Sequence, residues 1–232
     1  MIAILTTKTT HHVFFENQIF KKYKDIINVY ETTFIQPKFK INTIFEKKRE
    51  IFEKKICFQN KKFNFKGKSY AIKNINDNII FKILKKHNIK YLIVFGTRKI
   101  KKEIVNRYKN KIFNLHGGNP EEFRGLDSHY WSIYHNNFNL YSCLHKLSYK
   151  LDDGNIVFLK KIKLQKNMKI HQLRFKNTLY CIQMVLRLIY LIKNNKTIPT
   201  LKQKNESRYY SFMPKAIKDI VEKKFNLVLK NY

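Results

Sequence analysis

Several residue types and patterns that mark familiar protein classes are scarce or missing in this chain of 232 residues. It has three cysteines, Cys57, Cys143 and Cys181, which form neither a CxxC pair nor an even disulfide framework. We therefore expect reduced, buried thiols in a cytoplasmic protein. No HExxH sequence or Cys/His spacing indicates a metal, and no GxGxxG sequence indicates a nicotinamide-binding fold. The disulfide-rich, metal-binding and nicotinamide-dependent classes thus receive no support.

A long apolar run is also missing. The most apolar stretch, residues 179–192, is interrupted by Gln183 and Arg187 and is too short to span a bilayer. The first seven residues form a short strand-like run with no basic flank before it and no cleavage site after it, so we predict no signal peptide. We expect a protein without a membrane partner.

Acidic residues are few: 16 Asp and Glu stand against 48 Lys and Arg, which gives a formal net charge of +32. Such a charge predicts attraction to nucleic acid, anionic membrane or phosphorylated substrates. Alanine is equally rare, with only Ala3, Ala71 and Ala216, while Lys, Ile and Asn are over-used, as in an AT-rich genome. The basic residues are spread along the chain. We therefore interpret the charge as compositional drift that nucleotide binding exploits, and keep a dedicated nucleic-acid surface as the alternative.

What the chain does contain is enough apolar material for a core, with 44% hydrophobic residues, 19 Phe and 14 Tyr. Apolar runs and helical patterns alternate about every 20 residues, which is typical of a parallel, doubly wound sheet. We predict strands at 2–6, 26–30, 69–72, 91–95 and 112–116, and helices at 12–23, 77–87 and 100–108. A Lys/Phe-rich insertion at residues 32–68, with helical spacing over 45–52, breaks the alternation. The fold class is α/β, Rossmann-like and mostly parallel.

The second half of the chain has a different pattern. Residues 140–147 and 156–164 alternate as strands around a turn, which predicts an antiparallel pair at one end of the sheet. Asp127 can N-cap a helix through Tyr134. A long helix is expected over residues 170–193, with Leu173, Leu179, Ile182, Leu186 and Ile189 on one side. We divide the chain into a catalytic domain, residues 1–195, and a C-terminal tail, residues 196–232, that holds an exposed linker, an aromatic run and a short final helix.

The motif that carries chemistry begins at the end of the strand over residues 112–116. Asn114 and His116 stand two residues apart, so in a strand both side chains point to the same face. A Gly-Gly-Asn-Pro turn follows at once, then Arg124-Gly125, and Asp152 lies in a downstream Leu-Asp-Asp-Gly turn. The carboxyl ends of strands are where open α/β sheets bind ligands. The motif therefore predicts a site at this edge of the sheet.

The order of these residues resembles that of the folate-dependent formyltransferases, a family that includes the glycinamide ribonucleotide, methionyl-tRNA and sugar-nucleotide enzymes. The resemblance is firmest over residues 90–165 and extends over residues 1–195. It implies the formyltransferase fold and a catalytic set of Asn114, His116 and Asp152. It also implies a cytoplasmic enzyme that uses 10-formyltetrahydrofolate as its co-substrate and needs no metal.

Formyl transfer passes through a tetrahedral centre on which negative charge develops, and a preorganised donor can stabilise that charge by a few kcal/mol. Asn114 and His116 are the donors at the strand end. The attacking amine must lose a proton, which His116 or Asp152 can accept directly or through water. The residues alone leave open whether His116 is the base, the acid or the oxyanion donor.

On the folate side, the resemblance implies that the strand ending at Phe95 and the segment after it wrap the pterin with backbone groups, and that the segment around the Asp152 turn closes the opposite wall. The cofactor candidates are Phe95, Gly96, Thr97, Arg98, Lys99, Ile100, Tyr149 and Leu151. The family's usual apolar Ile-Leu-Pro is absent here.

For the acceptor, the resemblance offers three substrates. The glycinamide ribonucleotide enzymes carry a Gly-rich phosphate loop after the first strand, but residues 7–12 of this chain lack the glycine. The tRNA enzymes add a C-terminal barrel, whereas only a short tail follows residue 195 here. We therefore expect the amine of a dTDP-, UDP- or GDP-linked deoxysugar, used in surface polysaccharide synthesis, and keep glycinamide ribonucleotide as the alternative.

The candidates for acceptor contacts combine hydroxyl, imidazole and aromatic groups. They are Thr9, Thr10, His11, His12, Gly117, Arg124, His129, Trp131 and Tyr209. Trp131 and Tyr209 are the candidates for stacking on the base, and Arg124 braces its own loop. We expect a nucleotide-sugar partner and a possible homodimer. A non-catalytic basic module that binds nucleic acid is the hypothesis from a different class.

Overall fold

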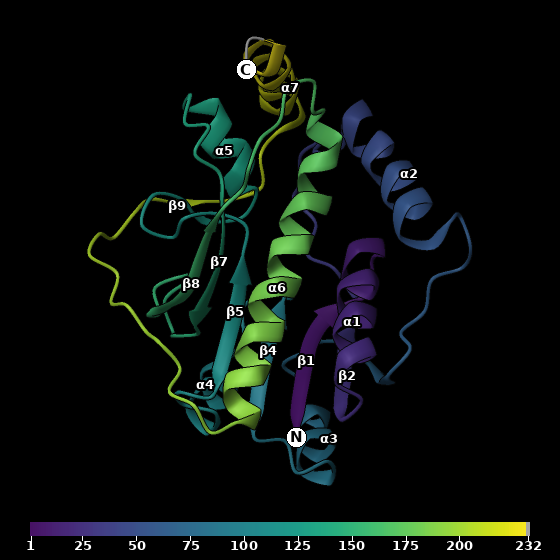
Figure 1. Ribbon diagram of the computed structural model, residues 1–232, viewed down its shortest axis with the longest axis vertical. Helices are drawn as coiled ribbons and strands as arrows, with labels where there is room; N and C mark the ends of the chain where they lie inside the picture. The colour runs from purple at the N-terminus through teal and green to yellow at the C-terminus, as the bar shows by residue number, and fades with distance from the viewer. Residues whose placement is uncertain (231–232) are drawn as a thin grey trace.

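The computed structural model describes residues 1–230 and contains one seven-stranded sheet with the order β3-β2-β1-β4-β5-β7-β8. Its strands are β1 (Ile2–Thr7), β2 (Ile26–Glu31), β3 (Lys68–Ile72), β4 (Tyr91–Phe95), β5 (Ile112–His116), β7 (Tyr141–Lys146) and β8 (Ile156–Lys161). The first five pair in parallel, and β5–β7 and β7–β8 are antiparallel. The predicted fold class is confirmed, including the antiparallel end (Figure 1).

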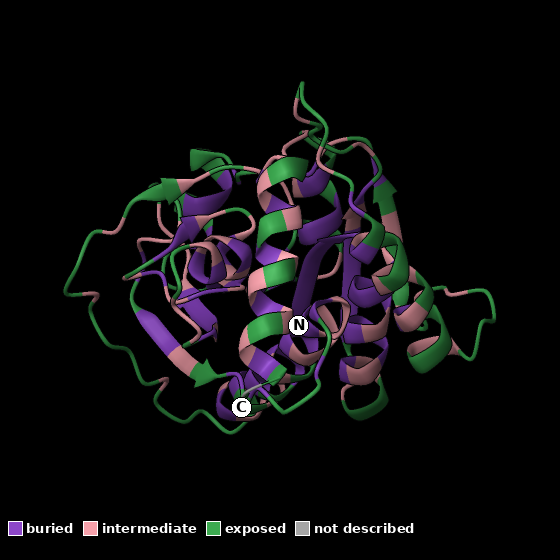
Figure 2. Ribbon diagram, turned by 90° about the horizontal axis from the view of Figure 1, so that it is seen from above, coloured by how far each residue is buried: buried purple, intermediate pink, exposed green. Residues whose placement is uncertain are grey.

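Helices cover both faces of this sheet. The helical segments within residues 1–230 are α1 (Thr10–Lys22), α2 (Ile44–Phe58), α3 (Ile79–Lys86), α4 (Lys102–Arg107), α5 (Ser128–Tyr134), the 3₁₀ turn η1 (Ile170–Gln172), α6 (Leu173–Lys193) and α7 (Lys215–Lys230), of which α1, α3, α4 and α6 pack on the sheet. One core lies between the sheet and α1 with α6, and a second lies between the sheet and α3 with α4. The central strands are buried, while the edge strand β3 and the outer surfaces of the helices are largely exposed (Figure 2). Crossover helices on both faces explain why the parallel strands read as continuous apolar runs.

The buried face of α6 differs from the predicted one. Leu173, Ile182 and Ile189 are buried, but Leu179 is 37% exposed. Leu186 is only partly buried against the first core. The stripe that does face the sheet and α1 includes Cys181 and Val185, both fully buried. Because α6 is apolar on more than one side, periodicity alone did not identify its inner face.

The insertion at residues 32–68 contains α2, as its helical spacing predicts. Thr43 begins the helix with a capping box: its side chain accepts from the Glu46 backbone N–H at 3.3 Å, and Glu46 accepts from the Thr43 backbone N–H at 3.0 Å. Arg174 of α6 then ties the helix to the body, because its Nε lies 2.9 Å from Glu53, which is fully buried. The insertion is therefore an integral layer beside α1 and α6.

The tail contains the expected exposed linker, since most residues of 194–208 are exposed, but the segments after it pack against the body. Its two-residue strand β9 (Tyr209–Tyr210) pairs in parallel with β6 (Arg124–Gly125). The final helix α7 has 16 residues, longer than the short helix predicted, and buries Val221, Phe225 and Leu229 in a third core with α5. Figure 1 shows the connecting segment running outside β8 and returning to β9. The division at residue 195 stays a prediction, and residues 231–232 of the predicted tail lie outside the described residues.

Asp127 does precede α5, but it does not cap the helix with its side chain. Its backbone has φ of 52°, a left-handed conformation, and its carboxylate accepts from the Met213 backbone N–H at 2.9 Å. The aspartate thus joins the start of α5 to the segment leading into α7.

Within residues 1–230, the helices fall short of the length and apolarity that a membrane crossing requires.

Glu16 of α1 carries a buried carboxyl group whose ionisation should affect the stability of the fold. The residue is fully buried, and neither of its side-chain oxygens has a hydrogen-bond partner in the described structure. Burial raises the pKa of Glu16 above its ordinary value, because the charged form loses its hydration. The nearby Oδ1 of Asn28 also lacks a partner and could accept from an amide.

We expect Glu16→Gln to raise the free energy of unfolding by about 1 kcal/mol at pH 7. Because the pKa of Glu16 is higher in the folded state than in the unfolded state, the ionised side chain destabilises the fold as the pH rises through the folded-state pKa. The difference in unfolding free energy between Glu16→Gln and the wild type should therefore vanish below the unfolded-state pKa, where both states bind the proton. Urea denaturation at pH 7 and at pH 4 measures both values. Glu222→Gln, at a half-exposed position on α7, is the control, and a pH-independent gain would contradict the assignment.

Candidate active site

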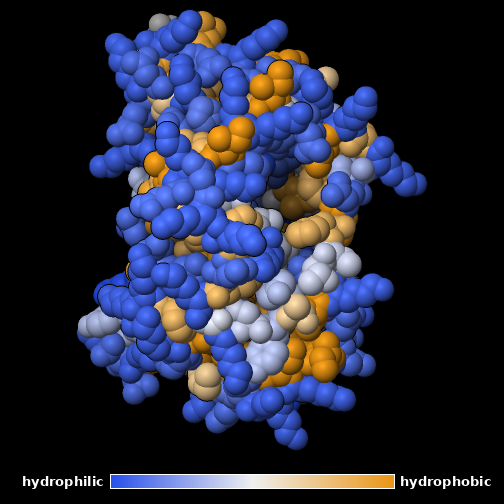
Figure 3. Space-filling view, turned by 90° about the vertical axis from the view of Figure 1, so that its right-hand side faces the viewer, coloured by the Kyte–Doolittle hydropathy of each residue, from blue (hydrophilic) through white to orange (hydrophobic). Residues whose placement is uncertain are grey.

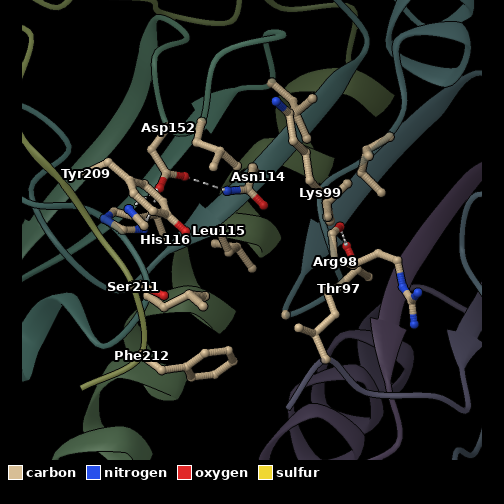
Figure 4. Close-up of a pocket in the computed structure, with 18 of the residues that line it drawn as sticks. Thr97, Arg98, Lys99, Asn114, Leu115, His116, Asp152, Tyr209, Ser211 and Phe212 are labelled. Carbon is tan, nitrogen blue, oxygen red and sulfur yellow. Dashed lines mark hydrogen bonds and ion pairs between the residues drawn. The ribbon is translucent and has the colours of Figure 1, made fainter. Parts of the chain in front are cut away.

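Three side chains meet at the carboxyl end of β5. Asn114 and His116 project from that strand, and Asp152 lies in the turn between β7 and β8. The Nδ2 of Asn114 donates to Asp152 Oδ1 at 3.2 Å, and His116 Nδ1 lies 3.4 Å from Asp152 Oδ2. Figure 4 shows the three groups facing one another at the wall of a pocket. The spacing of two residues in β5 and the antiparallel return through β7 and β8 produce this arrangement.

Asp152 is held as a carboxylate. Its side chain is 8% exposed, and Oδ2 also accepts from the Gly125 backbone N–H at 2.8 Å. Burial alone would raise the pKa of Asp152, but the charges of His116 and His145 and the hydrogen bonds from His145 and Gly125 hold it well below its ordinary value. A full negative charge therefore sits beside the two imidazoles at neutral pH.

His116 has both ring nitrogens engaged. Its Nε2 lies 2.8 Å from the Phe123 carbonyl oxygen, to which it donates, and its Nδ1 faces Asp152. The ring is 5% exposed and reaches the pocket with one edge. Gly118 makes room for it, because a side chain at that position would begin 2.9 Å from His116 Nε2. The Gly-Gly turn thus allows the chain to fold closely over the imidazole.

His145 is a member of this cluster that the sequence motif did not reveal. It stands directly opposite Asn114 in the β5–β7 pairing, and it is 1% exposed. Its Nε2 lies 3.2 Å from both Asp152 Oδ1 and Asn114 Nδ2, and its Nδ1 faces the Lys146 carbonyl at 2.9 Å. The available signal was its place in the strand that pairs with β5. The structure buries it beside Asp152.

The cluster opens into a cavity of about 850 Å³. Of the predicted cofactor residues, Gly96, Thr97, Arg98, Lys99, Ile100, Tyr149 and Leu151 line this cavity. Phe95 lies behind them with 7% exposure, packed against His12. The molecular surface is mostly hydrophilic and is hollowed where apolar side chains are visible (Figure 3).

Arg98 contributes backbone rather than charge to this wall. Its guanidinium is turned away, with Nε 2.6 Å from Glu31 Oε2 and Nη2 donating to the Thr33 carbonyl at 2.9 Å. Glu31 also accepts from the Arg98 backbone N–H at 2.8 Å. The end of β2 therefore fixes the segment after β4.

Sequence reasoning missed the part of the cavity mouth that the insertion forms. Phe34 and Phe39 of the insertion are about half exposed there, and Ser211 and Phe212 follow β9 on the other side. Figure 4 places Tyr209, Ser211 and Phe212 along one wall and Arg98 and Lys99 along the opposite one. No local pattern marks Phe34 or Phe39 as pocket residues, since their role depends on where the insertion packs.

The segment after β1 lies beside the cavity rather than in its lining. His11 and His12 are buried, and burial lowers the pKa of both, that of His12 to about 3. His12 Nδ1 lies 2.8 Å from the hydroxyls of both Thr7 and Thr9, and its ring packs against Gly96. Thr10 is buried as well and donates to Glu50 at 3.4 Å.

The remaining acceptor candidates divide between the cavity and its support. Tyr209 lines the cavity, but Gly117, Arg124, His129 and Trp131 do not. His129 is partly buried behind Gly117 and donates to the Tyr141 carbonyl at 2.6 Å, and desolvation lowers its pKa to about 4. Trp131 donates to the Ser211 carbonyl at 2.9 Å and packs against Tyr210.

Residues 1–230 contain no group of three or more His, Cys, Asp or Glu side chains that could hold a metal ion.

Comparison with known proteins agrees with this geometry. The family model described as formyl transferase matches residues 16–178. A methionyl-tRNA formyltransferase from Finegoldia magna is 28% identical over 155 residues, which is 66% of this chain and 49% of that protein. The chain thus spans about half the length of this curated relative.

Two solved structures share the fold. The formyltransferase PseJ from Anoxybacillus kamchatkensis has a TM-score of 0.56 and 17% identity, with 91% of this chain and 86% of that one covered. A phosphoribosylglycinamide formyltransferase from Anaplasma phagocytophilum has a TM-score of 0.61 and 12% identity, with 91% and 98% covered. Since the family model matches well over half of the sequence, including β5 and the Asp152 turn, the chain belongs to the formyl transferase family.

Proposed function

We propose that this protein transfers a formyl group from 10-formyltetrahydrofolate to the amine of a nucleotide-linked amino deoxysugar. The observation that carries the transferase assignment is the contact of Asn114, His116 and Asp152 at the wall of the 850 Å³ cavity. That volume suits a ligand the size of a folate head group. Residues 1–195 would form the catalytic domain.

In the proposed reaction the acceptor amine attacks the formyl carbon, and the carbonyl oxygen gains negative charge. The bond from that carbon to N10 of the folate then breaks, the amine nitrogen loses a proton and N10 gains one. Asn114 provides an amide donor for the oxygen, and His116 with Asp152 provides the path for the proton. Because Asp152 is ionised, it stabilises a positive charge on either neighbouring imidazole.

The folate side of the cavity is supported by its backbone. The segment from Gly96 to Ile100 lines the wall, and Gly96 has φ of 72° and packs on His12. Exposed main-chain groups at the ends of β4 and β5 can form hydrogen bonds with the edge of a pterin. PseJ, which shares the fold, was solved with tetrahydrofolate.

The sugar-nucleotide assignment rests on three features. The segment after β1 has its histidines buried and paired with Thr7 and Thr9, so it lacks the open Gly-rich loop expected for glycinamide ribonucleotide. Aromatic side chains at the cavity mouth can stack on a base or sugar, and exposed lysines there attract a diphosphate. PseJ was solved with a UDP-linked formamido sugar. A role in surface polysaccharide synthesis follows from this substrate class.

An aminoacyl-tRNA is the second candidate. It is favoured by the sequence match to a methionyl-tRNA formyltransferase and by the net charge of +32, which attracts the nucleic-acid backbone.

We expect removal of any one of the three polar groups to lower kcat by about two to four orders of magnitude, the range for general-base and oxyanion-donor losses. The substitutions are Asn114→Ala, His116→Asn and Asp152→Asn, and pairs of them should cost less than the sum of the single effects. Steady-state kinetics on folded protein tests this. His87→Asn, at the end of α3, is the control. Near-wild-type turnover by folded His116→Asn protein would exclude the proposed catalytic unit.

Turnover should be unchanged after dialysis against EDTA, because the proposed chemistry needs only side chains and the folate. The measurement is the initial rate with 10-formyltetrahydrofolate before and after chelation, followed by metal analysis. An activity lost with EDTA and recovered with zinc would contradict a metal-free mechanism.

The acceptor can be identified by mass spectrometry. We expect one or more aminosugar nucleotides to gain about 28 daltons, the mass of CO, when incubated with enzyme and 10-formyltetrahydrofolate, because the aromatic mouth suits a base. The panel contains dTDP-, UDP- and GDP-linked 3- and 4-amino deoxysugars, glycinamide ribonucleotide and methionyl-tRNA. Formylation of either of the last two, with no sugar nucleotide modified, would overturn the sugar assignment while preserving the transferase.

A further inference from the structure

Gln203 lies on an extended segment, residues 201–212, that we call the C-terminal strap. Its side-chain amide donates to two backbone carbonyls, those of Asp152 and Gly154, at 2.8 Å each. Its Oε1 accepts from Arg124 Nη2 at 2.9 Å. Both donor hydrogens and the acceptor oxygen of one side chain are therefore used, and all three bonds lead to the two loops that surround the Asp152 carboxylate.

The Asp152 turn depends on this amide. Within residues 1–230, no backbone N–H donates to the carbonyl of Asp152 or of Gly154, so Gln203 is their hydrogen-bond donor. Asp152 also has φ of 52°, a left-handed conformation that costs a non-glycine residue about 1 kcal/mol. A strained turn with two unpaired carbonyls would relax if the amide were removed.

The strap itself is fixed on both sides of Gln203. Before it, Leu201 and Ile156 exchange two backbone hydrogen bonds of 2.8 Å. After it, the Leu126 N–H donates to the Tyr210 carbonyl at 2.8 Å, next to the β6–β9 pairing. The amide is thus held between two anchored points and cannot follow the Asp152 turn if that turn shifts.

The other loop is Arg124-Gly125, and Gln203 holds it at the same time. Arg124 is 4% exposed, and its guanidinium also bonds the Pro120 carbonyl at 3.1 Å and Asp153 at 3.2 Å. Gly125 then donates its backbone N–H to Asp152 Oδ2. The carboxylate is therefore located by its own turn on one side and by Gly125 on the other, and Gln203 is bonded to both.

We propose that Gln203 is a positioning residue for the formyl-transfer site: it fixes the Asp152 carboxylate against His116, Asn114 and His145 without touching substrate. This inference rests on the proposed function for its catalytic consequence. Its structural consequence, the placement of Asp152, is independent of which acceptor is used.

We expect Gln203→Met, which keeps the length of the side chain but removes its hydrogen bonds, to lower kcat about ten- to a hundredfold, since small displacements of a catalytic group have effects of this size. Gln203→Glu keeps an oxygen for Arg124 but places the second carboxylate oxygen, an acceptor, against the two backbone carbonyls. It should lower kcat to a similar extent. KM for both substrates should change by less than about threefold, because Gln203 does not line the cavity. Gln183→Glu, on the exposed side of α6, controls for charge, and Lys202→Ala controls for changes to the strap.

Two further measurements separate positioning from a general loss of structure. In the variants the pKa of Asp152 should rise toward its ordinary value as the imidazoles lose contact, and the pH dependence of its carboxyl carbon-13 resonance measures this change. The ring-nitrogen resonances of His116 and His145 should shift in nitrogen-15 NMR spectra, while those of His87 should not. The NMR spectra need no activity, so they test the inference even if the wild-type protein formylates none of the acceptors.

Unshifted His116 and His145 resonances in folded Gln203→Met protein would overturn the placement role. Wild-type kcat in the folded variants, measured beside an active wild-type enzyme, would overturn the catalytic consequence. If either variant fails to fold, the other carries the same tests, and Gln203→Asn supplies a third that retains the amide but shortens its reach.

Discussion

The rest of the site depends on the contacts that the Asp152 carboxylate makes. It is a buried negative charge, and such a charge is stable only when surrounding donors replace water. Here Asn114, the Gly125 backbone and two imidazoles supply those contacts. These contacts come from three strands: Asn114 and His116 belong to β5, Gly125 to β6 and His145 to β7. This edge of the sheet is therefore assembled around the carboxylate, which contacts both histidine rings.

The fold provides this arrangement by a change of strand direction. Parallel strands β1, β4 and β5 end at one edge of the sheet, where Thr7, Val94 and His116 line the cavity. The antiparallel strand β7 then places His145 opposite Asn114, and the turn into β8 brings Asp152 back to the same edge. A further parallel strand could pair with β5 only after a crossover connection, and that connection would first carry the chain to the opposite edge of the sheet. The hairpin is thus the element that lets residues 38 positions apart share a hydrogen bond.

The sequence allowed the sheet and the meeting of Asn114, His116 and Asp152 to be predicted, because buried parallel strands are continuous apolar runs and these residues lie at one strand end and in a downstream turn. Other features depended on contacts between distant segments. His145 has no motif of its own, and Gln203 reaches Asp152 from 51 positions away. The phenylalanines at the cavity mouth belong to an insertion whose packing is set by Arg174 and Glu53, 121 positions apart. Leu179 matched the predicted stripe of α6 but faces solvent, since a helix apolar on several sides has no unique inner face.

The large positive charge acts differently outside and inside the molecule. In the interior, cations are matched to carboxylates: Arg98 to Glu31, Arg124 to Asp153, and Lys218 to Glu46. Such pairs fix geometry and leave little net field at the reacting atoms. The lysines around the cavity mouth, Lys38, Lys99 and Lys150, are instead exposed and add to the field of the whole surface. A field of this kind speeds the approach of anionic ligands more than it tightens their binding. Both proposed substrates are anions, so the many lysines favour their encounter with the cavity, while the proposed chemistry depends on the charge of Asp152.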